Sequence, residues 1–358
     1  MDRAPDLPRP DSGAAIPALS RFVIKERPEA NGLALRNQAL RDPGPEDVLV
    51  RIHSAAICGT DLHIYAWNRW AAQTYKPPFA MGHEFGGTVI ATGSAVKRVA
   101  IGDTVTAETH IPCGQCAQCR MNRRHTCENM RLFGRLGLGC MAEFTTVPEA
   151  ALRVVPRDIP IAFATMMEPM GVAVRAVREI DVGGANVLVL GCGPIGLFAI
   201  VAARAFGAAR ITASEPSGYR RELARSLGAD AVFDPIVTPV AAALGGAKID
   251  AVIDTSGNEQ AVAAALDCIR SGGDIVFASL PDRPFAIDIA RYVVLREITL
   301  RGVYGRRIDE TWLQVEALLR TRGSEFAKVL THRLPLERFD EAFALAASGE
   351  AGKVVLVP

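Results

Sequence analysis

The pattern of apolar and polar positions divides the chain into two regions. From about Phe22 to Val155, short apolar runs such as 47–52 and 86–91 are separated by Gly and Pro residues. Short apolar runs that end at turn-forming residues predict strands. We therefore expect the first region to be mainly β structure.

From about Pro169 the pattern changes to apolar strands that alternate with Ala-rich helical stretches. Continuous apolar strands between helices indicate an α/β arrangement, with a parallel sheet covered on both faces. From about Asp309 the chain returns to mixed helix and strand. The expected strands are 187–190, 211–214, 231–234, 249–254 and 273–278, and the expected helices are 195–206, 219–227 and 259–269.

A chain of 358 residues is too long for one ordinary core and suits two domains. The change in pattern predicts a first domain over 21–168 and 310–358 and a second domain over 169–309. Residues 1–20 are rich in Pro, Gly, Asp and Ser and lack the apolar stretch of a signal peptide. We interpret them as a mobile extension.

Charge and cysteine content narrow the classes of protein. The 40 basic and 39 acidic residues nearly cancel and form no block of one sign, which favours neither nucleic acid nor a membrane surface as a partner. The sequence contains no run of about 18 apolar residues, so we expect no transmembrane helix. The eight cysteines do not resemble a dense, secreted disulfide scaffold, so we expect reduced thiols in the cytoplasm.

A glycine-rich segment with the pattern G-x-G-x-x-G follows an expected strand and opens an expected helix. In this context the glycines let the backbone approach a pyrophosphate, and the first N–H groups of the helix face the phosphates. The pattern predicts a doubly wound, Rossmann-type sheet in the second domain. Its residues are Gly191, Gly193, Pro194, Ile195 and Gly196.

An acidic residue, Glu215, ends the strand that follows the glycine segment. A carboxylate at this spacing binds a ribose 2′-hydroxyl and repels a 2′-phosphate. We therefore expect NAD in preference to NADP, although the nearby Arg220 and Arg221 weaken that argument.

Four cysteines lie within fifteen residues, at Cys113, Cys116, Cys119 and Cys127. Close spacing lets one loop fold round a tetrahedral Zn²⁺, and four protein ligands leave no open position, so such a site is structural. An iron–sulfur cluster or disulfides remain alternatives, because iron–sulfur ligands also occur in C-x2-C-x2-C runs.

A second set of metal-ligating types comprises Cys58, His83 and a carboxylate, which is either Glu84 or Glu168. A catalytic zinc needs about three protein ligands and one open position. Taken alone, Cys58 reads as a small buried residue and His83 as a core histidine. Their occurrence beside the two preceding motifs favours a catalytic metal site.

Together, the segments 58–61 (CGTD) and 82–84 (GHE), the four cysteines and the Gly191 pattern resemble the zinc-dependent medium-chain alcohol dehydrogenases. The resemblance runs from about Phe22 to Pro358 in the expected order. It implies a GroES-like, mainly β catalytic domain and a Rossmann domain. It also implies NAD and two zinc ions per chain, one catalytic and one structural.

Within this family the segments 58–70, 108–114, 302–312 and 330–333 are most similar to the threonine-oxidising members. The resemblance implies oxidation of L-threonine to 2-amino-3-oxobutanoate. It assigns Thr60 and His63 to a proton relay, His110 to a position beside the substrate, and Glu168 to support of the zinc and the relay. The implied cofactor contacts are Ile195, Glu215 and Arg220, with Ala278, Ser279, Leu280, Val303 and Tyr304 on the nicotinamide side.

Some residues depart from the threonine-oxidising pattern. Glu168-Pro-Met resembles the polyol dehydrogenases equally, Val172 and Arg175 replace Asn and His, and 278–280 replaces Leu-Gly-Ile. A polyol, an aminocyclitol or another hydroxy compound is thus an alternative substrate, and a non-catalytic cofactor-binding relative is a further alternative. In either enzyme reading the partner is a small-molecule alcohol, and the family implies a homo-oligomer, a tetramer or a dimer. Trp67 and Trp70 either wall the substrate pocket or pack in a core.

Overall fold

The structure is a computed structural model that describes residues 16–40, 42–136, 138–281 and 283–358. Its chain forms two compact units, which we describe separately. The first unit comprises 1–168, 332–347 and 353–358, and the second comprises 169–331 and 348–352. Of the extension predicted over 1–20, residues 1–15 lie outside the described residues, whereas Leu19 and Ser20 belong to strand β1.

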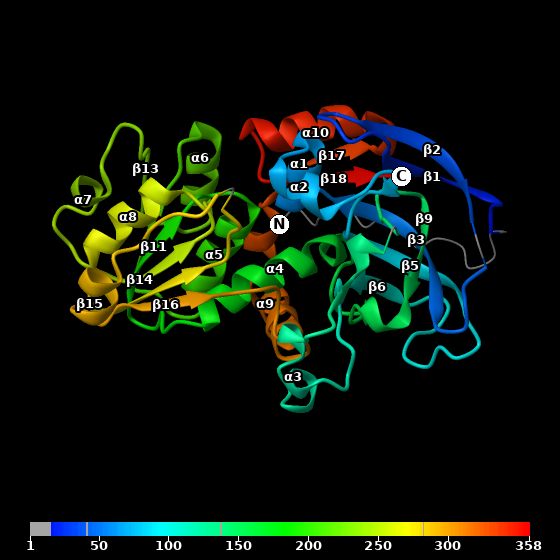
Figure 1. Cartoon of the computed structure of the whole chain (residues 1–358), viewed down its shortest axis with the longest axis horizontal. Helices are drawn as coiled ribbons and strands as arrows, with labels where there is room; N and C mark the ends of the chain where they lie inside the picture. The colour runs from blue at the N-terminus through cyan, green and yellow to red at the C-terminus, as the bar shows by residue number, and fades with distance from the viewer. Residues whose placement is uncertain (1–15, 41, 137, 282) are drawn as a thin grey trace. The chain divides into compact units, whose positions relative to one another are not determined.

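The second unit contains a six-stranded parallel sheet in the order β13-β12-β11-β14-β15-β16 (Figure 1). In chain order this arrangement is 3-2-1-4-5-6, the order of a doubly wound dinucleotide-binding sheet. The strands are β11 (Asn186–Leu190), β12 (Arg210–Ser214), β13 (Ala231–Phe233), β14 (Ile249–Asp254), β15 (Ile269–Phe277) and β16 (Thr299–Gly302). The α-helices are α5 (Pro194–Ala205), α6 (Gly218–Ser226), α7 (Val240–Ala243), α8 (Glu259–Cys268) and α9 (Glu310–Ala327). Residues Ile289–Val294 form a π-helix. Helix α4 (Ala164–Arg178) contains the position in the chain, 168/169, at which the first unit passes into the second.

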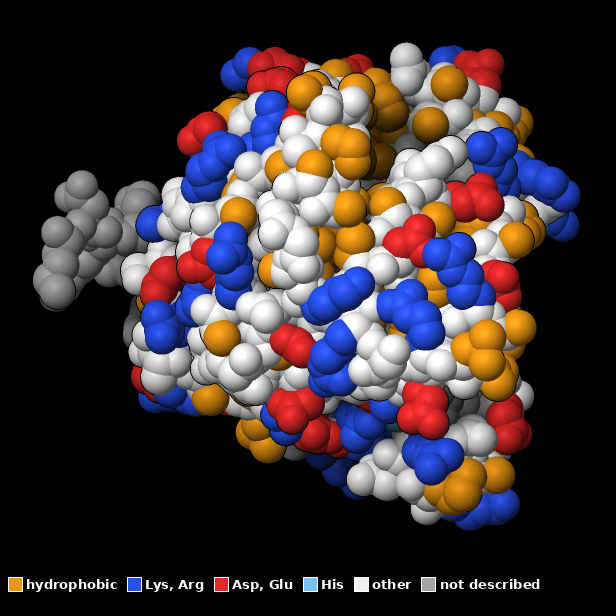
Figure 2. All heavy atoms as spheres, turned by 90° about the vertical axis from the view of Figure 1, so that its left-hand side faces the viewer, with side chains coloured by type: hydrophobic (Ala, Val, Ile, Leu, Met, Phe, Trp, Pro, Cys, Tyr) orange, Lys and Arg blue, Asp and Glu red, His pale blue; other side chains and the backbone are white. Residues whose placement is uncertain are grey.

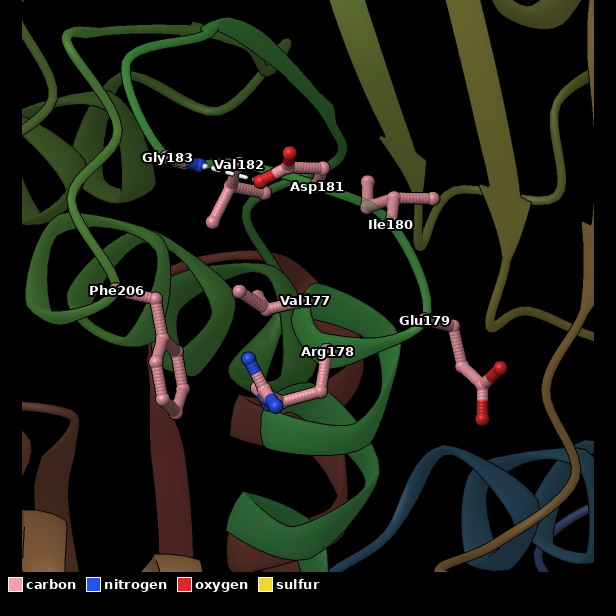
Figure 3. A pocket seen from close by; sticks show the side chains of 8 residues that line it. All are labelled: Val177, Arg178, Glu179, Ile180, Asp181, Val182, Gly183 and Phe206. Carbon is pink, nitrogen blue, oxygen red and sulfur yellow. Dashed lines mark hydrogen bonds between the residues drawn. The ribbon is translucent and has the colours of Figure 1, made fainter.

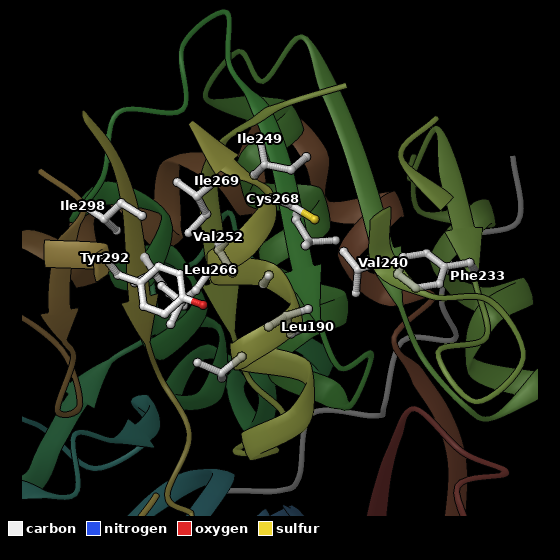
Figure 4. Packing of buried hydrophobic residues seen from close by; sticks show 14 residues of the cluster. Leu190, Phe233, Val240, Ile249, Val252, Leu266, Cys268, Ile269, Tyr292 and Ile298 are labelled. Carbon is white, nitrogen blue, oxygen red and sulfur yellow. The ribbon is translucent and has the colours of Figure 1, made fainter. Parts of the chain in front are cut away.

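Helices cover both faces of this sheet because the strands are apolar on both sides. Leu190 and Leu266 of α8 belong to one buried cluster on one face (Figure 4), which also includes Leu188 and Val262. Successive side chains of a strand point to opposite faces, so the equally buried Val187 lies on the other side. The predicted α/β fold class is confirmed.

Helix α9 extends the second unit beyond residue 309, where the sequence pattern placed its end. The ring centroids of Phe198 in α5 and Phe326 in α9 lie 6.0 Å apart, and both rings are fully buried. A helix that buries its apolar side against α5 belongs to the core of that unit, and the change of sequence texture at 309 did not reveal this contact.

The first unit is mainly β structure. Its largest sheet has the order β10-β6-β5-β3-β18-β17, with β9 paired to β3; a smaller sheet has the order β2-β1-β4, and β7 pairs with β8. The strands of the largest sheet are β3 (Asp47–Ala56), β5 (Glu84–Thr92), β6 (Thr104–Ala107), β9 (Phe144–Pro148), β10 (Leu152–Val154), β17 (Leu330–Pro335) and β18 (Lys353–Val357). The others are β1 (Leu19–Lys25), β2 (Leu33–Ala39), β4 (Phe79–Ala80), β7 (His110–Ile111) and β8 (Arg131–Leu132).

Short helices connect these strands. The α-helices are α1 (Gly59–Ala66), α2 (Arg69–Thr74), α3 (Ala117–Arg120) and α10 (Phe339–Ser348). The 3-10 turns are η1 (Arg124–Thr126), η2 (Phe133–Arg135), η3 (Glu149–Ala151), η4 (Ile161–Phe163) and η6 (Leu336–Arg338). Across the described part of the chain, no helix has the length and apolar character needed to cross a membrane.

The distribution of surface charge and the state of the cysteines agree with what the composition led us to expect. Basic and acidic side chains are interspersed on the face shown in Figure 2. All eight cysteines are free thiols. The alternative that the cysteine cluster forms disulfides is therefore not supported by the structure.

Candidate functional site

Cys58, His83 and Glu84 come together in the first unit, although Cys58 is separated from the other two by helices α1 and α2. One ligand atom from each residue lies within 4.8 Å of the others. A sulfur, an imidazole nitrogen and a carboxylate oxygen are ligands that Zn²⁺ accepts, and three of them leave a fourth position open. This donor set fits a zinc ion.

The local sequence places Cys58 at the start of α1. Cys58 is the N-cap residue, and its backbone N–H donates to Asp61 Oδ2 at 2.9 Å. A carboxylate at the third helical position that returns to the N-cap N–H is half of a capping box, which fixes the entry of the chain into the helix. Asp61 is almost fully buried, and its Oδ1 lies 3.7 Å from Nδ1 of His83. Asp61 thus positions both a thiol and an imidazole.

Backbone geometry places His83 directly before β5 and Glu84 at its first position. Gly82 has φ of +91°, and a Cβ at that position would lie 2.7 Å from Met141 Cγ. Only glycine fits this conformation and this contact without a shift of the neighbours. The glycine in the GHE segment therefore has a structural reason.

The charges around His83 raise its pKa. Burial alone would lower the pKa, but Asp61 and Cys58 beside the ring outweigh it, so the pKa of His83 lies well above the ordinary value. A metal ion that binds this imidazole must therefore displace a proton, and metal affinity depends on pH.

Glu84 has a partner that the sequence analysis did not identify. Its Oε2 lies 2.5 Å from Nζ of Lys353, the first residue of β18, and both side chains are buried. Nζ also donates to the carbonyl oxygen of Ile57, one residue before Cys58, at 3.0 Å. Within the described residues, Glu84 Oε1 has no hydrogen-bond donor, so one carboxylate oxygen remains for a metal ion.

Glu168 is engaged differently from Glu84. Its Oε1 accepts a hydrogen bond from Thr109 Oγ1 at 3.0 Å, and it is not part of the group of donor atoms that Cys58 and His83 form. Thr109 Oγ1 also lies 3.2 Å from Nδ1 of His110. The structure therefore brings the predicted residues Glu168 and His110 together through one hydroxyl group.

The proposed relay residues Thr60 and His63 lie three positions apart on α1, where residues share one face of a helix. His63 Nδ1 lies 2.8 Å from Nδ2 of Asn68. Asn68 is the N-cap of α2, and its Oδ1 accepts from the N–H of Ala71. The amide orientation is thereby set, so Nδ2 donates and the neutral imidazole carries its proton on Nε2.

The four-cysteine segment also forms a compact donor set. One ligand atom of each of Cys113, Cys116, Cys119 and Cys127 lies within 4.8 Å of the others. The N–H of Cys116 donates to Cys113 Sγ at 3.4 Å, and hydrogen bonds from Gln115 and Cys116 lower the pKa of Cys113 to about 6. Burial raises the pKa of Cys119 to about 12. Four convergent sulfurs with N–H donors suit a tetrahedral zinc ion.

In the second unit, the glycine-rich turn lies between β11 and α5. Gly191 has φ of +85°, and a Cβ on Gly196 would lie 2.0 Å from the carbonyl oxygen of Gly191. Gly193 is the N-cap of α5, and a Cβ there would meet no atom within 4 Å. The turn thus leaves open space at the helix N-terminus, which fits a pyrophosphate.

Glu215 follows β12 and faces the same turn. Its Oε2 accepts from the N–H of Cys192 at 2.7 Å, and its Oε1 accepts from the N–H of Ser217 at 2.9 Å. The carboxylate is therefore fixed beside the glycine turn, as a group that binds a ribose hydroxyl requires.

The two arginines near Glu215 are held by other groups. Arg221 Nη1 donates to Asp234 Oδ2 at 2.9 Å and to the carbonyl oxygen of Glu215 at 3.0 Å. Arg220 Nε donates to the carbonyl oxygen of Ala351 at 2.8 Å. The argument that they weaken the preference for NAD loses force, since Arg221 is already paired with a carboxylate.

The segments predicted to face the nicotinamide lie at the carboxyl ends of neighbouring parallel strands. The N–H of Val303 donates to the carbonyl oxygen of Phe277, and Tyr304 O accepts from Arg175. Buried Asp254, at the end of β14, accepts from Ser279 Oγ at 2.6 Å. Asp254 was not singled out from the sequence, and it ties the loop 278–280 to the loop after β14.

A separate hollow in the second unit takes no part in these sites. It has a volume of about 340 Å³ and lies where α4 ends, with Arg178 over the ring of Phe206 at 5.2 Å (Figure 3). No residue predicted to bind metal, substrate or cofactor lines it.

A Rossmann-type sheet with a phosphate-binding turn, together with two zinc-type donor sets, defines a metal- and nucleotide-dependent dehydrogenase. Residues 44–157 match the alcohol dehydrogenase GroES-like domain family, and residues 194–321 match the zinc-binding dehydrogenase family. The chain belongs to the zinc-binding alcohol dehydrogenases and is an enzyme of that family. The predicted family and enzyme class are confirmed.

Individual relatives agree with this assignment. An L-threonine 3-dehydrogenase from Caldanaerobacter subterraneus is 43% identical over 320 residues, which cover 88% of this chain and 92% of the relative. The solved structure of 2R,3R-butanediol dehydrogenase from Bacillus subtilis is 26% identical, with a TM-score of 0.83 over 95% of this chain and 99% of that chain. A zinc-binding dehydrogenase from Sinorhizobium meliloti bound to NADP is 27% identical, with a TM-score of 0.86 over 96% of this chain and 100% of that chain.

Proposed function

We propose that the enzyme oxidises the 3-hydroxyl group of L-threonine to a ketone at a zinc ion, with NAD as the hydride acceptor. The product of this reaction is 2-amino-3-oxobutanoate. The observation that carries the proposal is the convergence of Cys58, His83 and Glu84 in a chain that is 43% identical to an L-threonine 3-dehydrogenase.

Each residue of the metal site has a defined task in this proposal. Cys58, His83 and Glu84 hold the zinc ion, and Asp61 and Lys353 keep the imidazole and the carboxylate in place. When bound, zinc supplies Lewis acidity, which favours loss of the proton of a coordinated hydroxyl group near neutral pH.

The proton of the substrate hydroxyl leaves through residues of α1. Thr60 accepts and passes it on, and His63 delivers it to solvent, a task that suits an imidazole because one ring nitrogen can accept a proton while the other donates one. Asn68 orients the ring of His63 through the bond to Nδ1. His110, which Thr109 links to Glu168, lies beside the substrate.

The second unit holds the nucleotide. The open turn at Gly193 binds the pyrophosphate and Glu215 binds the adenosine ribose, while Ser279 and Tyr304 lie on the nicotinamide side. When bound there, NAD would supply the nicotinamide ring that takes up the hydride. We expect NAD to bind more tightly than NADP, because the Glu215 carboxylate repels a 2′-phosphate.

The metal assignment is tested with Cys58→Ser. We expect this variant to hold one zinc ion per chain instead of two, to lose dehydrogenase activity and to keep its affinity for NAD. Cys268→Ser, a thiol in α8 of the other unit, is the matched control and is expected to keep two zinc ions. Full turnover by a Cys58→Ser enzyme that contains one zinc ion would refute the assignment.

The substrate is tested by following NADH absorbance with threonine, sorbitol and 2,3-butanediol, with NAD and NADP in parallel. We expect threonine with NAD to give the highest kcat/KM. A higher value for sorbitol or butanediol would replace threonine with a polyol or a diol and leave the zinc chemistry intact.

We also propose that the enzyme is a cytoplasmic homo-oligomer, either a dimer or a tetramer. Eight free thiols suit a reducing compartment. Strand β16 is the edge of the parallel sheet, and the segment before it exposes Val294 and Leu295, which are 66% and 79% accessible. An open edge beside apolar side chains suits symmetric pairing with a second copy.

Light scattering during gel filtration tests the oligomer. Leu295→Glu is expected to lower the molar mass to that of a smaller species. Ile236→Glu, at a position that is also exposed but lies after β13, should leave the mass unchanged.

A further inference from the structure

The backbone segment that carries Arg135 lies directly beside the candidate metal site. It ends the short turn η2, in which the fully buried Phe133 packs on Phe85 with 6.0 Å between the ring centroids. Gly134, which lies between Phe133 and Arg135 in the chain, contacts His83, because a Cβ built on Gly134 would be 3.2 Å from the Cβ of His83. The position of Arg135 is therefore tied to the residue that supplies the imidazole.

The guanidinium group of Arg135 lies over an aromatic wall that also contacts the relay. Its central carbon is 6.0 Å from the ring of Trp70 and 5.8 Å from the ring of Tyr75. The ring of Trp70 in turn lies 5.9 Å from His63. Arg135 and His63 thus contact the same indole, that of Trp70.

The positive charge of Arg135 is not neutralised by the protein around it. In the described residues, no carboxylate lies within salt-bridge distance of its guanidinium, and the side chain is exposed. Tyr75 is a neutral phenol, because burial raises its pKa. The guanidinium group donates one hydrogen bond to the phenol oxygen of Tyr75. A guanidinium has five N–H donors, so the remaining ones are available for a planar anion.

We propose that Arg135 forms a carboxylate-binding subsite beside the zinc position, which selects hydroxy compounds that carry a carboxylate near the reacting carbon. The subsite rests on the proposed function, because it is the zinc-bound substrate that Arg135 meets. A carboxylate accepts two parallel N–H bonds from a guanidinium, and this fixes the orientation of the substrate as well as its affinity. Neutral diols and polyols lack the group that Arg135 binds.

Four small secondary alcohols distinguish the effect of the substrate carboxylate on activity from that of the ammonium group. L-Threonine carries a carboxylate and an ammonium group, 3-hydroxybutanoate carries only the carboxylate, 1-amino-2-propanol carries only the ammonium group, and 2,3-butanediol is neutral. We measure kcat/KM of the zinc-loaded enzyme with NAD, before and after the substitution Arg135→Gln. We expect kcat/KM to fall about 10- to 100-fold more for the two carboxylates than for the other two alcohols. A factor of this size corresponds to the loss of one charged hydrogen bond. Most of the loss is expected in KM.

A binding measurement accompanies the kinetics. Quenching of tryptophan fluorescence by 3-hydroxybutanoate in the zinc-loaded enzyme without NAD gives a dissociation constant that is expected to rise by a similar factor in Arg135→Gln. Arg135→Lys, which keeps the charge but not the planar fork, is expected to recover part of the selectivity. Arg131→Gln, an equal change of charge four residues earlier on β8, is the matched control and should not change the ratio between substrates.

The outcomes separate this subsite from the proposed function. If Arg135→Gln leaves the ratio and the dissociation constant unchanged, or if Arg131→Gln changes them equally, the subsite is wrong even where threonine is oxidised. If the wild-type enzyme prefers the neutral diol to both carboxylates, the subsite is also wrong. If 3-hydroxybutanoate but not threonine is turned over in an Arg135-dependent way, the subsite stands and threonine is replaced as the substrate.

Discussion

Oε2 of Glu84 lies 2.5 Å from Nζ of Lys353, on side chains that are 1% and 2% exposed. Burial of this pair costs free energy, because both charges are removed from water. In return, the ammonium group holds the Glu84 carboxylate in place. Glu84 raises the pKa of Lys353 against the effect of burial, so the ammonium group stays charged. Removal of either partner leaves the other charge buried alone.

The first prediction concerns this pair. In zinc-free protein, Lys353→Met is expected to lower the free energy of unfolding by about 3 kcal/mol, the usual effect of an uncompensated buried charge. The double variant Lys353→Met/Glu84→Gln should recover much of that loss, which a denaturant titration measures. Lys328→Met, which removes an exposed lysine, is expected to change the value by less than about 0.5 kcal/mol. Equal effects of the two single lysine variants would show that the pair has no special weight.

His53 predicts a dependence of stability on pH. Burial, with a smaller effect of Arg51, lowers the pKa of His53 from 6.5 to about 4, and Nε2 lies 2.7 Å from Thr88 Oγ1. Between these two pKa values the unfolded chain binds the proton and the folded chain does not, so stability falls as the pH drops from about 6.5 towards 4.

The test compares the wild-type enzyme with His53→Gln at two pH values. Gln keeps a polar partner for Thr88 and does not titrate. Between pH 7.5 and pH 5.0 we expect the wild type to lose roughly 2 kcal/mol more of its unfolding free energy than the variant, from the linkage relation. Parallel pH profiles of the two proteins would contradict the assignment.

The four-cysteine segment predicts a second, structural zinc ion. Elemental analysis of the wild-type enzyme is expected to give two zinc ions per chain, and Cys116→Ser is expected to give one, because three sulfurs hold zinc less firmly. The affinity for NAD should persist in this variant. Iron in the analysis, with absorbance of an iron–sulfur cluster in the visible range, would favour the alternative metal centre.

Asp234 is expected to influence the choice between NAD and NADP. It pairs with Arg221 beside Glu215, so Asp234→Asn frees a guanidinium next to the residue that we propose binds the ribose. We expect the dissociation constant of NADP to fall by about 10-fold, the value of one charge-assisted hydrogen bond, while that of NAD changes less.

A double-mutant cycle separates this effect from the general loss of a negative charge. With Arg221→Met already present, Asp234→Asn should no longer improve NADP binding. An equal gain with and without Arg221 would show that the effect is not transmitted through the guanidinium.

Local motifs were enough to predict which residues of the turn and of the cysteine segment lie together, whereas their role in binding stays a prediction. The glycines of the 191–196 turn and the spacing of the four cysteines define their geometry within a few residues, so the structure agrees with them closely. Asp61 was also within reach, because a carboxylate three residues after Cys58 is the sequence sign of a capping box.

Contacts between segments remote in sequence were not predictable in the same way. Lys353 reads as an ordinary lysine before an apolar strand, and nothing near it indicates that β18 pairs with β3 and carries its ammonium group to Glu84. Arg135 likewise reads as a loop residue until Gly134 is seen against His83. The end of the second unit was misjudged for the same reason, since the packing of Phe326 on Phe198 is a tertiary contact.

The pairing of Glu84 with Lys353 also bears on the order in which the nascent chain matures. Cys58, His83 and Glu84 leave the ribosome early, whereas β18 is the last strand in the chain. Until β18 pairs with β3, Glu84 lacks its ammonium partner, and burial of its carboxylate carries the full cost of removing an unpaired charge from water. Docking of β18 on β3 therefore adds a strand to the largest sheet and at the same time supplies the counter-charge that a buried Glu84 requires, so one late contact completes both the sheet and the surroundings of the metal site.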